Sequence, residues 1–440
     1  MSKNSHKFVC TNCGYETSRW MGQCQSCGEW STLVEEQVES STGVKQVKAT
    51  KIFTVKNIEK NKRGRISTGF TEFDRVLGGD TKEVGIVEGS VVLISGDPGI
   101  GKSTLLLQTC ANVYSKLQNI LYISAEESVE QVALRAERII RDTNAMDKIN
   151  LVYSSSVEEI IATIEKFKSD FVIIDSIQTI ETDSVKGFAG GLAQVKNSAI
   201  KLANFAKSNN VTMFIIGHIT KEGNIAGPKL LEHLVDTVIQ IEGEKNTDLR
   251  IVRGLKNRFG ATNEVGILKM EVAGLSDVSN PSDYFLTKKS LPGICKSAIL
   301  EGNRMLVVEV QSLVSTTVYP LPKRVAEGVS ISRLQLICAI IQKYLRINLS
   351  DKDVYLNIAG GLKVSDRALD LAIAISIVSS IKNKAVDPDI VAMGEIALTG
   401  FIGRVTSEEH RKNEIKRLGF RFLTSSSKLN HVSGIISILA

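Results

Sequence analysis

Short apolar runs alternate with longer amphipathic segments between residues 90 and 220. The runs that predict buried strands are SVVLIS (90–95), NILYISAEE (119–127), FVIIDS (171–176) and VTMFIIGH (211–218). The segment TLLLQTCANVYSK (104–116) between two of them has the length and apolar spacing of a helix. Strands that alternate with helices are typical of a parallel, doubly wound sheet, so the pattern predicts an α/β fold.

The pattern changes after residue 233. The runs HLVDTVIQIEG (233–243), LRIVRGLKNRFG (249–260) and EVGILKMEV (264–272) follow one another without a helical segment between them. Such runs predict strands joined by hairpins. We therefore expect an antiparallel extension of the parallel sheet within one domain that spans residues 66–280.

The last third of the chain predicts a separate α+β domain over residues 286–440. PSDYF (281–285) is interpreted as a linker. The elements expected after it are strands at 304–314, 353–364 and 389–400 and helices at 331–345 and 367–381.

Composition and charge add modest constraints. Apolar residues make up 43% of the chain and aromatic residues 5%, so the cores must consist mainly of Ile, Leu and Val. Residues 44–65 carry eight Lys or Arg against one acid, Glu59, which favours a solvated basic linker over residues 36–65. The N-terminus lacks an apolar leader and no run of eighteen apolar residues occurs, so we expect a cytoplasmic protein without a membrane segment.

Four of the seven cysteines lie within the first 27 residues. The pairs CTNC and CQSC are each followed by a glycine, at Gly14 and Gly28, which suits a tight turn around a metal ion. This doubled spacing predicts a structural zinc ribbon over residues 1–35, with a pair of redox dithiols as the alternative. We expect Trp20 and Trp30 to pack over the two turns. The predicted Zn²⁺ ligands are Cys10, Cys13, Cys24 and Cys27.

GDPGIGKST joins the strand at 90–95 to the helix at 104–116 and is a phosphate-binding P-loop. Backbone amides at such a helix start surround phosphate oxygens, and glycines permit the close approach. Lys102 is predicted to reach the β and γ phosphates of ATP, and the Ser103 hydroxyl to bind Mg²⁺. The predicted nucleotide-binding residues are Gly96, Asp97, Pro98, Gly99, Ile100, Gly101, Lys102, Ser103 and Thr104.

Polar residues end the other predicted strands, where a nucleotide crevice is expected. Asp175 is predicted to hold Mg²⁺, as the carboxylate at the end of the second conserved strand of P-loop ATPases does. Glu126 is interpreted as the base that orients the attacking water, with Glu127 as runner-up, on a strand expected next to the P-loop strand. His218 is predicted to sense the γ-phosphate.

The order of these elements, with the lead-in ISTGFTEFDRVLGGD (66–80), resembles the RecA-type ATPase core. The four-cysteine ribbon, the P-loop and KNRFG (256–260), in that order, resemble the RadA (Sms) family of bacterial DNA-repair proteins nearly from end to end. In that family the pentapeptide is linked to ATP turnover and DNA engagement, a role that would fall here to Lys256 and Arg258. The alternative is two solvated cations on a hairpin. The carried-over motif is Lys256, Asn257, Arg258, Phe259 and Gly260.

The resemblance implies a DNA-dependent ATPase that forms a hexameric ring on single-stranded DNA. It would branch-migrate recombination intermediates on branched DNA together with the RecA recombinase. The loops at 181–196 and 220–229 are the expected DNA contacts, through Lys221 and Lys229 and through base stacking on Phe188.

The C-terminal domain resembles the proteolytic domain of Lon, which uses a Ser-Lys dyad. Ala368 occupies the nucleophile position and Glu409 the lysine position; Ser365 and Lys412 lie three residues away from them. We therefore interpret the C-terminal domain as a protease fold that has lost its activity and is reused for assembly. A Lon-type protease and a RecA-type signalling ATPase without a DNA role are the alternative functions.

Overall fold

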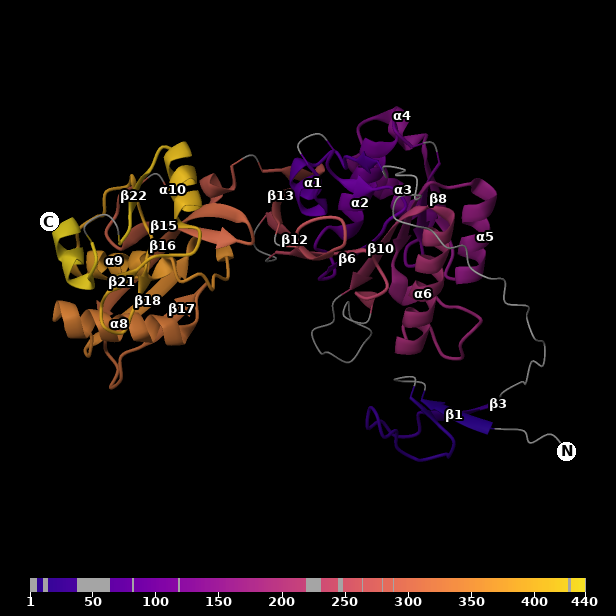
Figure 1. Cartoon of the computed structure of the whole chain (residues 1–440), viewed down its shortest axis with the longest axis horizontal. Coiled ribbons are helices and arrows are strands. Elements are labelled where there is room, and N and C mark those ends of the chain that lie inside the picture. The colour runs from indigo at the N-terminus through magenta and orange to yellow at the C-terminus, as the bar shows by residue number, and fades with distance from the viewer. Residues whose placement is uncertain are drawn as a thin grey trace, which may run out of the picture. The chain divides into compact units, whose positions relative to one another are not determined.

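The computed structural model describes residues 6–10, 15–37, 64–80, 83–117, 119–218, 231–243, 248–262, 264–278, 280–287, 289–425 and 429–439. The chain forms two compact units, Met1–Asp277 and Val278–Ala440 (Figure 1). Within the described residues, no helix is long and apolar enough to cross a membrane.

The N-terminal ribbon is a small three-stranded antiparallel sheet. Its strands are β1 (His6–Cys10), β2 (Glu16–Thr17) and β3 (Leu33–Gln37), in the order β2-β1-β3. Cys10, Cys24 and Leu33 are its buried hydrophobic residues. So small a core leaves much of the folding free energy to be supplied by a bound metal ion.

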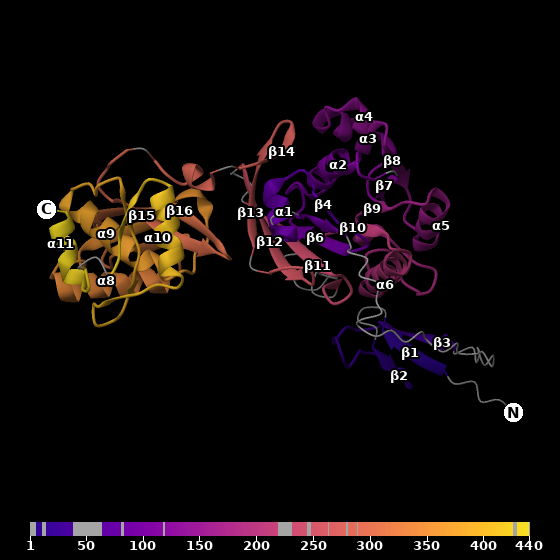
Figure 2. The ribbon, with the colours of Figure 1, turned by 45° about the horizontal axis from the view of Figure 1, so that its top comes forward.

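A nine-stranded sheet forms the centre of the first unit, in the order β14-β13-β12-β11-β6-β10-β9-β7-β8 (Figure 2). The six strands from β11 to β8 run parallel to one another, which confirms the predicted α/β class. The strands are β6 (Val91–Gly96), β7 (Ile120–Ser124), β8 (Ile149–Tyr153), β9 (Phe171–Asp175), β10 (Thr212–His218), β11 (Thr237–Glu242), β12 (Leu249–Asn257), β13 (Val265–Glu271) and β14 (Gly274–Asp277).

The antiparallel extension is also confirmed. β12 pairs with β11, β13 with β12 and β14 with β13, all antiparallel. One expectation was wrong: β7, which leads to Glu126, pairs with β9 and β8 and not with the P-loop strand β6. β10 and β9 stand between them, because the crossover that follows β9 places β10 directly against β6.

Helices cover both faces of this sheet (Figure 1). One apolar cluster joins one face to α1, α2 and α3, and a second joins the other face to α5 and α6. The two clusters follow from the uninterrupted apolar strands, whose alternate residues point to opposite faces. The helices are α1 (Thr71–Leu77), α2 (Lys102–Val113), α3 (Val129–Ile139), α4 (Thr143–Met146), α5 (Val157–Phe167) and α6 (Leu192–Asn209), with a 3-10 turn η1 (Ile177–Thr179).

The predicted basic linker ends earlier than expected. Arg65 lies on β4 (Arg65–Ile66), which pairs with β5 (Ile86–Val87) in the first unit. Its guanidinium donates hydrogen bonds to main-chain oxygens instead of facing solvent. Residues 38–63 of the expected linker lie outside the described residues.

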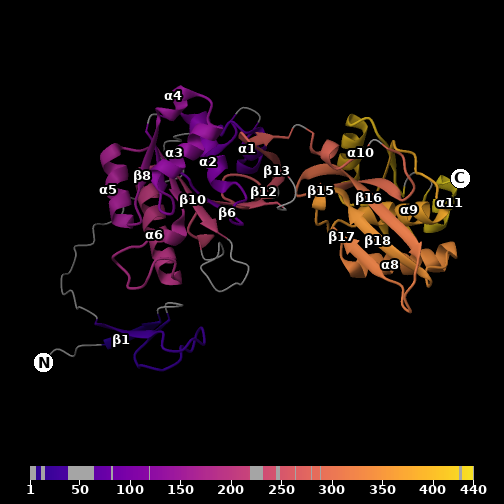
Figure 3. The ribbon, with the colours of Figure 1, turned by 180° about the vertical axis from the view of Figure 1, so that it is seen from behind.

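The second unit is an α+β structure around a six-stranded sheet of order β17-β18-β16-β15-β19-β22 (Figure 3). Its strands are β15 (Ile294–Glu301), β16 (Arg304–Thr316), β17 (Arg324–Glu327), β18 (Lys352–Ile358), β19 (Ile390–Ala392) and β22 (Arg421–Leu423), with a separate pair β20 (Glu395–Ile396) and β21 (Ile402–Gly403). Its helices are α8 (Ile331–Leu345), α9 (Leu369–Lys382), α10 (Glu408–Arg417) and α11 (Ile435–Ile438), with 3-10 turns η2 (Pro281–Tyr284), η3 (Ala359–Gly361) and η4 (Val432–Gly434).

Two expectations for this unit were wrong in detail. The segment 281–285 is not a free linker, because it forms η2 and its Ser282 hydroxyl accepts a hydrogen bond from the Val307 amide, with Phe285 buried. The strand expected at 389–400 is divided between β19 and β20, which belong to different sheets.

Candidate functional site

The P-loop joins a strand to a helix, as the sequence predicts: β6 ends at Gly96, and α2 begins at Lys102, two residues before the predicted helix start. Gly96, Gly99 and Gly101 all have positive φ, at 155°, 76° and 112°. A Cβ at Gly96 would lie 2.5 Å from the Ile241 carbonyl oxygen, and one at Gly101 would lie 2.5 Å from the Met270 methyl carbon. Only glycine allows this backbone at these two positions, and glycine-rich turns of this kind can place backbone amides around a phosphate.

Lys102 is buried at the start of α2. Its ammonium donates to the main-chain oxygens of Gly96 and Asp97, both at 2.9 Å. Burial lowers the pKa of Lys102, although the nearby carboxylates of Asp175 and Glu126 partly offset that effect. The ammonium is therefore held inside the loop that is predicted to surround the phosphates.

Asp175 ends β9, and its carboxylate accepts a hydrogen bond from the buried Tyr122 hydroxyl. Burial raises the pKa of Asp175, and hydrogen bonds from Tyr122 and Ser103 act in the opposite direction. The structure thus brings together the two residues predicted to bind Mg²⁺, Ser103 and Asp175. A hydroxyl oxygen beside a carboxylate is the donor set that this ion prefers.

Glu126 lies after β7 and meets residues from two other strand ends. Its carboxylate is 3.3 Å from His218 Nε2 and accepts a hydrogen bond from the Ser176 hydroxyl. The hydrogen bond from His218 is the main reason that the pKa of Glu126 is lowered. Glu127, the runner-up, forms an ion pair with Arg135 instead.

Two buried polar atoms lie beside this group. In the described part of the chain, His218 Nδ1 and Gln178 Oε1 have no hydrogen-bond partner. The Gln178 amide donates to the His218 main-chain oxygen at 3.4 Å. Buried polar atoms of this kind are normally satisfied by water or ligand, so the end of β10 has capacity to bind a polar group.

The pentapeptide 256–260 lies at the end of the strands opposite to the P-loop. Thr237, at one end of β11, pairs with Asn257, while Ile241, near the other end, pairs with Gly96 of the P-loop. Four residues of strand separate these positions by about 13 Å. The pentapeptide and the P-loop of one chain therefore belong to opposite ends of the parallel strands.

The two cations of the pentapeptide differ in their surroundings. Lys256 donates to the main-chain oxygens of Glu232 and Val235, at 2.6 and 3.0 Å. Arg258 is half exposed and pairs with Asp236 at 3.1 Å. Arg258 is thus the cation that remains available at the surface.

One of the two predicted DNA loops can be described, and it is shorter than the predicted 181–196 because α6 begins at Leu192. The first half of the loop 181–191 is held by Gln194 on α6, whose side chain forms hydrogen bonds with the main chain of Thr182 and Val185. Phe188, the predicted stacking residue, is 77% exposed. The loop at 220–229, with Lys221 and Lys229, lies outside the described residues.

The ribbon gathers three of the four predicted metal ligands. The sulfur atoms of Cys10, Cys24 and Cys27 all lie within 4.8 Å of one another, and those of Cys10 and Cys27 are 3.7 Å apart. Sulfurs bound tetrahedrally at about 2.3 Å from a zinc ion are about 3.8 Å apart, so the spacing fits a metal site. Cys13 lies outside the described residues.

Gly28, after the second cysteine pair, has φ of 74°, and its amide donates to the Cys24 oxygen in the expected tight turn. The expectation for the tryptophans was wrong. Trp20 and Trp30 are 62% and 69% exposed, because Leu33 and the cysteines already fill the core of the ribbon.

The protease positions in the second unit hold no dyad. Ala368 is fully buried, and Glu409 on α10 is 82% exposed. Ser365 is exposed, and Lys412 pairs with Glu408 at 2.8 Å and Glu409 at 3.0 Å. These bonds raise the pKa of Lys412, which is the opposite of what a general base requires.

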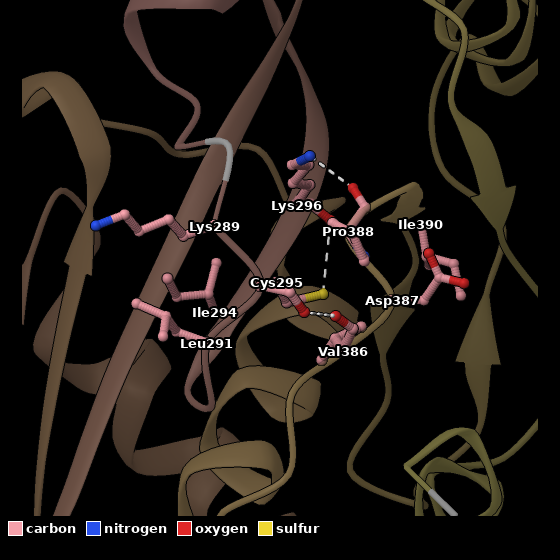
Figure 4. Close-up of a pocket in the computed structure, with 10 residues that line it drawn as sticks. Lys289, Leu291, Ile294, Cys295, Lys296, Val386, Asp387, Pro388 and Ile390 are labelled. Carbon is pink, nitrogen blue, oxygen red and sulfur yellow. Dashed lines mark hydrogen bonds between the residues drawn. The ribbon is translucent and has the colours of Figure 1, made fainter.

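A pocket in the second unit holds about 10 Å³, the room of roughly one water molecule (Figure 4). Lys296 at its wall donates to the Pro388 oxygen at 2.6 Å, and burial lowers its pKa. None of the four residues considered for the protease dyad lines this pocket.

Sequence reasoning missed three residues that hold the first unit's functional segments. Tyr122 supports Asp175, Arg250 donates from Nε to the Ile100 oxygen of the P-loop at 3.0 Å, and Arg65 reaches the pentapeptide. Tyr122 and Arg250 had a signal, because a tyrosine hydroxyl within a buried strand, or an arginine on the buried face of a strand, needs a polar partner. Arg65 gave no such signal, since it is only partly buried at the end of a basic run.

The fold and the site define the class: a RecA-like P-loop ATPase preceded by a metal-binding ribbon. Two family models agree, one described as AAA domain at residues 83–224 and one as Rubredoxin metal binding domain at residues 8–35.

Curated relatives define the family. DNA repair protein RadA of Bacillus subtilis is 42% identical, and those of Streptococcus pyogenes serotype M1 and Pseudomonas aeruginosa are 44% and 43% identical. Each alignment covers 96% of this chain and 92% of the relative. The chain belongs to the RadA family of DNA repair proteins.

A solved structure of the RadB recombinase also aligns, at 21% identity with a TM-score of 0.39. It covers 48% of this chain and 99% of the other. This similarity is too low to support a conclusion.

Proposed function

We propose that this chain is a DNA-dependent ATPase of recombinational repair that moves on single-stranded DNA as a hexameric ring and branch-migrates recombination intermediates. The observation that carries the proposal is the convergence of Lys102, Asp175, Glu126 and His218 at the carboxyl edge of a parallel sheet. A P-loop cradle with acids at this edge is the arrangement that NTP hydrolysis requires.

Each residue has a role in this scheme. The amides of residues 96–104 hold the phosphates of ATP, and Lys102 exchanges its two carbonyl partners for β and γ oxygens. Ser103 and Asp175 would hold Mg²⁺, which would supply positive charge to neutralise the phosphates. Glu126 accepts a proton from the attacking water, and its hydrogen bond to His218 links the base to the strand end that faces the γ-phosphate.

The position of the pentapeptide supports assembly. Arg258 lies at the sheet edge opposite its own P-loop, so it can act on ATP only in another copy of the chain. A head-to-tail contact that places this edge of one subunit against the carboxyl edge of the next generates a ring if the rotation closes. The alternative role for Lys256 and Arg258 is contact with DNA phosphate.

The remaining parts have supporting roles. Single-stranded DNA contacts the loops at 181–191 and 220–229, and Phe188 stacks on a base. The second unit serves assembly, and the RecA recombinase is the partner on branched DNA. All of this takes place in the cytoplasm.

Zinc in the ribbon is part of the proposal. Cys10, Cys13, Cys24 and Cys27 would hold one Zn²⁺ per chain, which elemental analysis measures directly. Replacing Cys24 and Cys27 by Ser should remove the metal while the ATPase sheet stays folded. Purified wild-type chain without metal but with intact thiols would contradict the assignment.

The direct test of the activity is the ATP hydrolysis rate with and without single-stranded DNA, with Lys102→Ala as the blank. We expect hydrolysis that rises when DNA is added and is abolished in the variant. A hydrolysis rate that does not change when DNA is added would favour a signalling ATPase. Hydrolysis coupled to degradation of casein would favour a Lon-type protease.

A further inference from the structure

Arg65 makes an unusual set of contacts for a residue at the end of a basic segment. Its Nη1 donates to the main-chain oxygens of Leu77, Gly78 and Gly85, at 3.2, 2.8 and 2.8 Å. Its Nη2 donates to the Phe259 oxygen at 2.6 Å, across 194 residues of sequence. One guanidinium therefore joins the C-terminal end of α1, the start of β5 and the pentapeptide 256–260.

The chemistry explains why this residue is an arginine. The carbonyls at a helix C-terminus are acceptors without intrahelical partners and carry partial negative charge. The planar guanidinium offers five donors in a fixed geometry, so it can serve several carbonyls at once. Burial lowers the pKa of Arg65, and Asp80 and Glu83 counteract this. A lysine ammonium, with three donors from one atom, cannot span all four acceptors.

The turn 257–260 depends on the same helix end. Asn257 donates to the Leu77 oxygen at 3.0 Å and accepts from the Phe259 amide at 2.9 Å. A Cβ at Gly260 would lie 3.5 Å from the Gly78 Cα. Arg65 and Asn257 thus hold the pentapeptide turn on α1 from two sides, and Arg258 projects from that turn.

We propose that Arg65 is a positioning residue that fixes the 256–260 turn and so sets where Arg258 is presented. Arg65 is also the last cation of the basic run 44–65, so that run ends at a residue whose side chain contacts this turn. This inference rests on the proposed function for the consequence in ATP turnover, and on the contacts alone for the position of the turn.

Hydrogen exchange of the full-length chain tests the position. In Arg65→Ala, exchange of the peptide that spans 256–260 should rise by about fivefold or more, while that of the P-loop peptide stays unchanged. Arg75→Ala is the matched control, since Arg75 lies on α1 and pairs with Glu72 at 3.6 Å, away from the pentapeptide. Arg65→Lys gives the same test with the charge kept, should Arg65→Ala fail to fold.

ATP turnover tests the consequence. Arg65→Ala should bind ATP within about twofold of the wild type and lose turnover, and Arg65→Ala with Arg258→Ala should be no worse than Arg258→Ala alone, because coupled residues are not additive. Unchanged exchange at 256–260, or losses that multiply in the double variant, would overturn the inference. If Arg258→Ala alone keeps full turnover, the proposed role of the pentapeptide fails, and the exchange result still decides the role of Arg65.

Discussion

Lys102 and Lys412 are the lysines on which the two candidate activities depend, and their surroundings are opposite. Lys102 is buried, bonds only to carbonyl oxygens of its own loop among its described partners, and has a lowered pKa because of burial. Lys412 is held by Glu408 and Glu409 on its own helix, and these hydrogen bonds raise its pKa. A cation whose partners are neutral carbonyls can transfer to an arriving phosphate, whereas one that carboxylates already neutralise gains little by moving.

The same contrast extends to the neighbouring groups. Around Lys102, the ends of three strands place Asp175, Glu126 and His218 together. In the second unit, Arg411 is fully buried and pairs with Asp366 at 2.7 Å, two residues before Ala368. That ion pair holds together the two segments that carry Ala368 and Glu409, and Ala368 is buried and has no nucleophilic atom.

The largest effect should come from Lys102→Ala. The variant would lose the cation proposed to bind the β and γ phosphates, and turnover of ATP should fall by about 10²- to 10³-fold. Steady-state hydrolysis with single-stranded DNA present measures it. Lys412→Ala serves as the matched control and should keep the wild-type rate. An equal fall in the ATP hydrolysis rate of both variants would contradict the proposed difference between the two lysines.

A smaller effect should come from Tyr122→Phe. The variant removes the hydroxyl that bonds to Asp175 while keeping the ring in the core. Partners that orient a metal ligand are typically worth about tenfold or more in metal affinity, so the Mg²⁺ concentration needed for tight ATP binding should rise by about tenfold. Fluorescent-nucleotide binding against Mg²⁺ concentration measures it, and Tyr153→Phe on the neighbouring β8, where Tyr153 is exposed, is the control.

A pH-dependent effect should appear at Glu158, which accepts hydrogen bonds from Lys201 and Thr182 at the start of the 181–191 loop. Burial would raise the pKa of Glu158, but these bonds outweigh it and lower the pKa from 4.5 to about 2. The stabilisation is thus complete above pH 4.5 and is lost as the pH falls from 4.5 toward 2. In urea unfolding at pH 6, the wild type should have a higher free energy of unfolding than Glu158→Gln. This difference in free energy should shrink below pH 4.5.

No effect at all is expected on peptidase activity. Wild-type chain should not degrade casein with or without ATP, and Ser365→Ala and Lys412→Ala should match it. Degradation that stops in either variant would restore the protease hypothesis and remove the distinction between the two units.

Local pattern was sufficient for much of the fold and the site. The apolar runs identified the parallel strands, and the glycine spacing identified the P-loop, because both signals lie within a few residues. The order of the strands did not follow from the pattern: Glu126 follows β7, which lies three places from β6, yet it reaches the site because all the parallel strands end at one edge. Tyr122 and Arg65 were missed because their partners lie 53 and 194 residues away.

The central claim is that ATP is hydrolysed at the carboxyl edge of one subunit with help from the opposite edge of the next. Mixing Lys102→Ala with Arg258→Ala tests it most directly, since each variant alone should be nearly inactive. In a random ring of equal parts, about a quarter of the contacts pair an intact P-loop with an intact Arg258. The account predicts that DNA-dependent hydrolysis reappears on mixing. A mixture no more active than the average of the two variants would contradict it.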